Sequence, residues 1–305
     1  MITKEFLQQK LDLTEIEAKA LYRNLKSNPQ TQLEVLCQNE ITIEDRINFY
    51  KDLGISGFQL ANYNFLLTYN TKVSETQIKH CIRAKIKYLE NELDIKPTEL
   101  YQDSFLQLLA LDCTHTPTEN PFGLQARVEF FKKKTGTTNE NLKKNIQLLR
   151  FDVTETPQEN SDGIQAKLEV LKNLGLSKEY VANHLTILMA PAQKLPVRYA
   201  MGISIFKNTE FLNNPLWATF DENKTFARFC YLKYKFNDAT NLKNIFDGKN
   251  NKINPSSLYL STPRFEKRFN VKDEKLQTTF PLTDNVKQTI KLNYIAFANE
   301  NEQEK

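Results

Sequence analysis

The feature that most constrains the fold is an internal repeat with a period of 40 residues. The segments that start at Thr116 and Thr156 share the frame T-P-x-E-N-x-x-G-[LI]-Q-A-[RK], in register. One such unit cannot bury its apolar face alone, so neighbouring units must stack. The repeat therefore predicts an all-α protein, a superhelical α-solenoid of three-helix units. Weaker copies of the long helix begin at Ile41, Ile82, Leu195 and Thr225.

Each copy contains signals for three helices. In the first clear copy, residues 116–119 read T-P-x-E, a capping box with proline at the first helical position, which predicts a short helix of about one turn. Gly123 then permits a bend into a longer helix that ends at Gly136, and Thr138 starts a third helix. The second clear copy repeats these signals at residues 156–159, Gly163, Gly175 and Ser177.

Charge is distributed unevenly along the chain. Residues 1–204 hold 25 Lys and Arg and 25 Asp and Glu, whereas residues 205–275 hold 13 basic and 8 acidic residues. We therefore expect a near-neutral repeat array over 1–204, a degenerate basic cap over 205–275, and a C-terminal segment over 276–305 whose polar tail frays. The net charge of +4 is too small to establish nucleic-acid binding by itself.

Several classes of protein find no support in the sequence. No apolar run approaches 18 residues, and the N-terminus has no signal or transit-peptide pattern, so we expect a cytoplasmic protein without membrane contact, or a secreted bacterial effector. The four cysteines, Cys37, Cys81, Cys113 and Cys230, are far apart and are expected to be reduced and buried. No nucleotide-binding, hydrolase or zinc motif is present, so no enzyme activity, cofactor or metal is expected.

One position in the long helix is basic in copy after copy. Stacked units would align these cations along one track, which suits a regular row of phosphates. Two structural interpretations compete: the cation pairs with a repeated acid such as Glu119 or Glu159, or it caps the helix ending of an adjacent unit. The residues at this position are Arg46, Lys85, Arg127, Lys167, Arg198 and Arg228.

A second basic cluster lies in the C-terminal third. Lys233 and Lys235, together with Arg228, alternate with the aromatic residues Phe226, Phe229, Tyr231 and Tyr234. Aromatic and basic residues together are typical of surfaces that bind single-stranded nucleic acid. A core helix with a basic outer face produces the same pattern.

The stretch from Lys167 to Arg198, KLEVLKNLGLSKEYVANHLTILMAPAQKLPVR, resembles the repeat unit of the mTERF family, the mitochondrial transcription termination factor-like proteins. The segment from Ser261, STPRFEKRFNVKDEKL, is similar to the proline-arginine segment near the C-terminus of that family. The resemblance implies a left-handed superhelix with a basic concave groove that binds double-stranded DNA or RNA. It adds Arg264 and Arg268 to the candidate contacts, but the 40-residue unit is longer than is usual in the family.

The sequence thus favours a non-enzymatic, monomeric solenoid that holds phosphates in a groove lined by Lys and Arg. The alternative is a solenoid that binds a protein or peptide, for which the near-neutral charge of residues 1–204 is the main argument. The direction and pairing of the repeated cations discriminate between the two.

Overall fold

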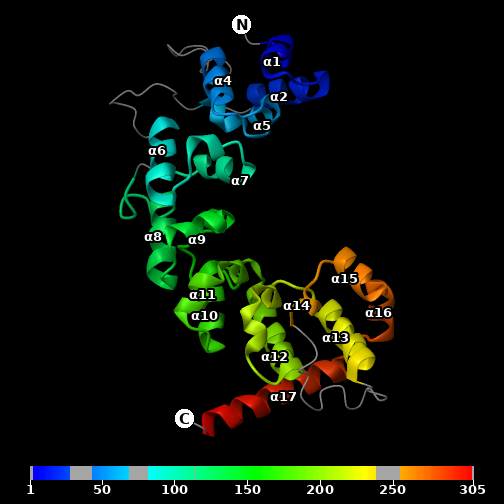
Figure 1. Cartoon of the computed structure of the whole chain (residues 1–305). Coiled ribbons are helices and arrows are strands. Elements are labelled where there is room, and N and C mark those ends of the chain that lie inside the picture. The colour runs from blue at the N-terminus through cyan, green and yellow to red at the C-terminus, as the bar shows by residue number, and fades with distance from the viewer. Residues whose placement is uncertain (1–2, 28–42, 69–81, 114, 238–254, 304–305) are drawn as a thin grey trace. The chain divides into compact units, whose positions relative to one another are not determined.

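Every regular element in the residues that the structure describes is a helix (Figure 1). The computed structural model describes residues 3–27, 43–68, 82–113, 115–237 and 255–303. The chain forms two compact units, Met1–Thr154 and Glu155–Lys305. The expectation of an all-α protein is confirmed. Two of the four cysteines, Cys113 and Cys230, are free and buried as expected, and Cys37 and Cys81 lie outside the described residues.

The first unit consists of short helices joined by tight connections. Its α-helices are α1 (Lys4–Leu11), α2 (Glu15–Ser27), α4 (Ile43–Asp52), α5 (Gly57–Asn62), α6 (Ile82–Leu93), α7 (Asp103–Leu106), α8 (Leu124–Thr135) and α9 (Asn139–Lys144). Its 3-10 helices are η2 (Asn64–Thr68), η4 (Pro97–Glu99), η5 (Gln107–Ala110) and η6 (Ile146–Arg150).

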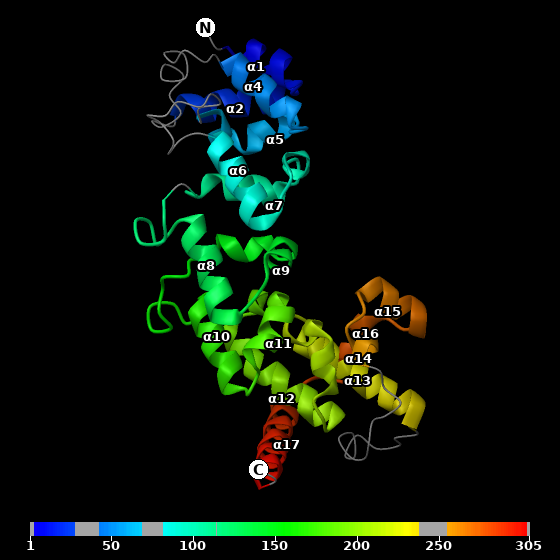
Figure 2. The ribbon, with the colours of Figure 1, turned by 60° about the vertical axis from the view of Figure 1, so that its left-hand side comes forward.

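The second unit begins with the same kind of elements and also contains the two longest described helices, α13 and α17 (Figures 1 and 2). Its α-helices are α10 (Ile164–Asn173), α11 (Lys178–Asn183), α12 (Leu195–Phe206), α13 (Glu222–Asn237), α14 (Pro255–Leu258), α15 (Thr262–Phe269), α16 (Asp273–Thr279) and α17 (Asp284–Gln303). Its 3-10 helices are η7 (Leu185–Met189), η8 (Ala192–Lys194), η9 (Glu210–Asn213) and η10 (Pro215–Ala218).

The predicted helix boundaries are confirmed where they depend on a specific cap. Gly136 follows α8 with a φ of 77°, and its N–H donates to the carbonyl of Lys132, which is the left-handed ending that glycine favours. Thr138 and Ser177 cap α9 and α11 by accepting hydrogen bonds from the N–H groups of Asn141 and Tyr180.

The short helix predicted for residues 116–119 is instead a hydrogen-bonded turn. The capping-box contacts do form, since Glu119 Oε2 accepts from the N–H of Thr116 at 2.9 Å. The turn ends at Asn120, whose side-chain amide donates to Asp112 and whose Oδ1 accepts from the N–H of Phe122. Local side-chain hydrogen bonds of this kind compete with the backbone hydrogen bonds of a helix. The chain therefore forms a single turn here and does not continue as a helix.

The predicted third helix is also divided. Three copies have a short α-helix, then a residue with φ between −108° and −129°, and then a 3-10 helix, whereas α7 passes directly into η5. The dividing residues are Tyr63, Asn145 and His184. The apolar residues predicted for the copy at 138–150 all reach the core, because Leu142, Ile146 and Leu149 are buried.

The C-terminal helix α17 packs along α12 within the second unit (Figures 1 and 2). Ser204 donates a hydrogen bond to the carbonyl of Ile290, and the rings of Tyr199 and Tyr294 lie 5.9 Å apart. The chain stays helical through Gln303, so the tail that was expected to fray is helical up to that residue. The boundaries expected after residues 204 and 275 both fall inside helices, α12 and α16. No described helix combines the length and the apolar character needed to span a bilayer.

Candidate functional site

The cations at the repeated position of the long helix lie in the interior. Five of the six keep less than a tenth of their surface exposed, and the sixth, Arg198, is half-buried. The exposed fractions are 1% for Arg46, 3% for Lys85, 7% for Arg127, 3% for Lys167 and 0% for Arg228.

Most of these side chains donate hydrogen bonds to backbone carbonyl groups at the end of a following helix. Arg127 Nη1 donates to the carbonyls of Leu149 and Phe151, at 3.1 and 2.7 Å. Lys85 Nζ repeats this pattern one copy earlier, with the carbonyls of Leu109 and Leu111 at 2.7 and 2.9 Å. The same contact joins Arg46 to Leu67, Arg198 to Ala218, and Arg228 to Leu258 and Leu260.

The last carbonyl groups of a helix have no partner within that helix, and a buried carbonyl without a partner costs free energy. The 3-10 helix that ends each copy points such carbonyls into the core. A long aliphatic stem with a multivalent cationic head can cross the core and satisfy several of them at once. Burial lowers the pKa of Lys85, an effect partly offset by Cys113 and Asp112.

Two of the repeated cations also lie near carboxylates. Lys167 Nζ is 3.9 Å from Asp162, and Arg198 Nε is 3.3 Å from Glu222, which in turn lies 3.3 Å from Lys194. Glu119 and Glu159, proposed as partners from the sequence, instead bind Thr116 and Thr156 in the two capping boxes.

The last repeated cation, Arg228, forms a buried ion pair with Asp273. Its Nε donates to Asp273 Oδ1 at 2.8 Å, and its Nη2 binds Asp273 Oδ2 at 2.5 Å, a bidentate arrangement. Burial opposes ionisation of Asp273, but the hydrogen bonds and charge of Arg228 outweigh it, so the pKa of this carboxyl is below its ordinary value. The pair attaches α16 to α13.

The geometry of the repeated position therefore corrects the expectation of an open row of phosphate contacts. Cations that are buried and bound to carbonyls are not available to a groove. The capping interpretation fits better, with one change: the cation of Arg127 caps the ending of its own copy, 22 and 24 residues later, rather than that of an adjacent unit.

The basic candidates of the C-terminal third divide into buried and exposed groups. Lys233 is buried on α13, where Phe226 and Phe229 also belong to the core, so this part of the aromatic pattern marks a core helix. Lys235 is exposed at the end of α13, with Nζ 5.6 Å from the Tyr231 ring.

Arg264 and Arg268 are exposed on α15, as a surface contact requires. Sequence reasoning missed three further exposed cations beside them, Lys267, Lys272 and Lys275. The high density of Lys and Arg between residues 264 and 275 could have indicated these cations. It shows no periodicity, however, that would distinguish exposed positions from buried ones. We call the five cations Arg264, Lys267, Arg268, Lys272 and Lys275 the α15–α16 basic surface.

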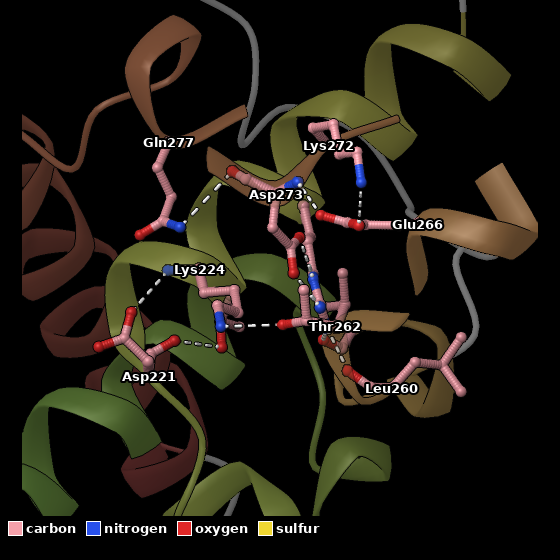
Figure 3. Close-up of polar contacts among 11 residues, drawn as sticks. Asp221, Lys224, Leu260, Thr262, Glu266, Lys272, Asp273 and Gln277 are labelled. Carbon is pink, nitrogen blue, oxygen red and sulfur yellow. Dashed lines mark hydrogen bonds and ion pairs between the residues drawn. The ribbon is translucent and has the colours of Figure 1, made fainter. Parts of the chain in front are cut away.

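An open hollow of about 570 Å³ lies on this surface. Lys267, Lys272 and Lys275 supply its cations, and Glu266 is its one carboxylate. Glu266 accepts from Lys272 Nζ at 3.0 Å and from the N–H of Asp273 at 3.0 Å, and these bonds lower the pKa of Glu266 (Figure 3).

Other chemistry-bearing side chains have structural partners. His115 Nδ1 contacts Asp112, and His184 stacks on the ring of Tyr180 at 4.5 Å. Burial raises the pKa of the Cys113 thiol to about 12, so this thiol is unreactive near neutral pH. Within the described residues no group of three or more His, Cys, Asp or Glu is placed to hold a metal, and His80 and Cys81 lie outside them.

Comparison with known proteins adds no assignment, since no protein-family model, curated protein or solved structure matches the chain. The resemblance to the mTERF family stays a prediction.

Proposed function

We propose that this chain is a non-enzymatic α-solenoid of the mTERF type that holds the phosphates of DNA or RNA. In this proposal the contacts come from exposed cations of the second unit, Lys235 and the α15–α16 basic surface, and the repeated cations hold the helices together. The observation that carries it is the charge of α15 and α16: five exposed cations face solvent with only two carboxylates outside the core, Glu266 and Glu274. The third carboxylate, Asp273, is buried against Arg228.

The solenoid part of the proposal is supported by contacts between successive copies within the first unit. Gln59 donates to Asp103, 44 residues later, at 2.9 Å, and Gln107 donates to the Tyr63 hydroxyl across the same separation at 3.1 Å. Lys143 pairs with Glu99, again 44 residues away, at 2.9 Å. Contacts whose separation stays near the repeat period are what stacked nearest neighbours produce.

An exposed basic surface binds nucleic acid mainly through phosphate charge, without a base code. Fluorescence anisotropy with labelled duplex DNA and duplex RNA, at low and moderate salt, tests the function. We expect binding that weakens as salt rises, and weaker binding with a smaller salt dependence for the triple variant Lys235→Glu, Arg264→Glu, Arg268→Glu.

A matched control changes the same charge elsewhere in the second unit: Lys172→Glu, Lys287→Glu and Lys291→Glu, all exposed in the wild type. The control should retain most of the affinity. Equal losses in both triple variants would show that only bulk charge matters, and absence of binding at low salt would overturn the proposal.

A second candidate function, peptide or protein binding, is favoured by two aromatic side chains of the first unit. Phe58 and Tyr101 are 55% and 52% exposed, and the side-chain amide of Gln59, the residue after Phe58, donates to the carbonyl of Tyr101. Exposed aromatic residues are typical anchors of protein interfaces. Selection of peptides from a display library, with loss of binding in Phe58→Ser, Tyr101→Ser, would support this function.

A further inference from the structure

The hollow between α15 and α16 has the composition of a ligand site as well as a charged surface. Three ammonium groups line it together with the amide of Asn270 and the apolar side chains of Pro263 and Val271. Its volume of about 570 Å³ lies within the roughly 300–1,000 Å³ common for small-ligand pockets. A stretch of lysines that only improved solubility would not need a concave shape with an apolar wall.

The charges of the hollow favour an anion. The ammonium groups of Lys267 and Lys275 make no hydrogen bond or ion pair with another described residue, so both are available to bind an anion. Lys272 is shared with Glu266, whose two oxygens are both occupied by hydrogen bonds. With three cations and one carboxylate, the lining residues carry a net charge of +2.

The core beneath the hollow fixes its shape and removes a repulsive charge. Asn270 ends α15 in the left-handed conformation, with φ of 52°, and so turns the chain directly into α16. Asp273, at the start of α16, is buried and paired with Arg228. A carboxylate at that place on the surface would repel an anion from the lysines.

We propose that this hollow binds one nucleotide unit, with its phosphate on Lys267 and Lys275 and its sugar or base against Pro263 and Val271. The inference rests on the proposed function and names the place where one unit of the bound nucleic acid is held. The shared chemistry is a phosphate ester with an adjoining apolar group, which a free mononucleotide and a nucleotide within a strand both supply.

Isothermal titration of the full-length protein with adenosine 5′-monophosphate, and with adenosine as the uncharged probe, tests the site. We expect one site for the mononucleotide, and binding of adenosine that is at least tenfold weaker. Lys267→Gln and Lys275→Gln should each weaken mononucleotide binding, roughly two- to fivefold for one exposed ion pair lost. Lys287→Gln and Lys291→Gln remove the same charge from α17 and should leave it unchanged.

A second arm separates free nucleotides from strands. An oligonucleotide of about ten nucleotides should compete with adenosine monophosphate, because the hollow holds a unit of a strand. Failure to compete would keep the hollow as a site for free nucleotides and overturn its role in holding the bound nucleic acid. Equal binding of adenosine, equal effects of the α17 variants, or no mononucleotide binding would overturn it. Salt-dependent duplex binding that persists without mononucleotide binding would leave the proposed function intact and remove only this site.

Discussion

Two sets of basic residues in this protein have opposite environments. Five of the six repeated cations are buried in the core and most donate to backbone carbonyls, whereas the α15–α16 basic surface faces solvent. Arg228 is fully buried, while the Lys272 side chain is 78% exposed although it lies one residue from Asp273, the partner of Arg228. The same two residue types thus act as interior hydrogen-bond donors in one set and as surface charge in the other.

This difference indicates that the cations at the repeated position have a structural role. The repeated position recurs in copy after copy, and at most of its occurrences the cation satisfies carbonyl groups at a helix ending. The surface with an excess of positive charge lies on α15 and α16, outside the two clear copies of the repeat. In a helical array a repeated polar residue should therefore be tested first as a cap, and a non-repeated cluster of charge as a binding surface.

The largest effect should come from breaking the buried ion pair. Arg228→Met leaves the Asp273 carboxylate in the core without its partner and orphans two carbonyls, those of Leu258 and Leu260. Removing one member of a buried pair costs about 3–5 kcal/mol. We expect a loss of this size in the free energy of unfolding of the second unit, measured by urea denaturation with hydrogen exchange to assign the unit.

The control for this prediction is Arg264→Met, an exposed arginine on α15. The double variant Arg228→Met, Asp273→Leu should recover part of the loss, because no unpaired charge is then buried. Equal stability of Arg228→Met and Arg264→Met would contradict the distinction between the two sets of cations.

A smaller loss is expected at a cap that has no buried carboxylate partner. Arg127→Met keeps an aliphatic side chain but leaves the carbonyls of Leu149 and Phe151 without the donors described above. An unsatisfied buried group costs about 1–3 kcal/mol. We expect a loss in this range for the first unit, with faster amide exchange in η6.

Lys134→Met changes an exposed cation of the same helix and should leave both the stability and the exchange of η6 unchanged. Arg127→Lys should fall between the two, since lysine at the equivalent position, Lys85, reaches two carbonyls. A uniform increase of exchange across the unit, without emphasis on η6, would argue against a local cap.

The buried pair also makes stability depend on pH. Since the folded pKa of Asp273 lies below its ordinary value of 3.8, its stabilising contribution is complete above that value and is lost as pH falls through the folded pKa. The difference in unfolding free energy between wild type and Asp273→Asn should therefore be constant above about pH 5 and shrink below about pH 4. Urea titrations at several pH values measure it; a constant difference down to pH 2 would exclude this linkage.

Much of the fold could be predicted because it depends on local chemistry. Gly136 and Thr138 mark a helix end and a helix start through their own conformational preferences. The division of the third helix at Asn145 could not be predicted, because the 3-10 ending depends on a donor, Arg127, that comes from another helix. A local sequence pattern cannot predict a tertiary contact of this kind.

The site was harder to predict than the fold. Arg127 and Lys275 are both cations near apolar residues in the sequence, and only packing distinguishes a buried cap from an exposed ligand contact. The repeat indicates Arg127 as a phosphate contact, but the exposed Lys275 is better placed for that contact. Arg264 and Arg268 were selected through the family resemblance and do lie on the exposed surface.

The smallest effect on stability is expected at the surface, where binding changes instead. Arg268→Gln removes one exposed guanidinium and should leave the free energy of unfolding nearly unchanged. If this group contacts one phosphate, the slope of the logarithm of the duplex DNA binding constant against the logarithm of salt concentration should fall by about 1. Lys172→Gln, at an exposed site outside this surface, should keep the wild-type slope. A reduced slope with unchanged stability for Arg268→Gln, together with a large stability loss for Arg228→Met, would distinguish surface cations that bind phosphate from buried cations that stabilise the fold. An unchanged slope would remove Arg268 from the phosphate contacts.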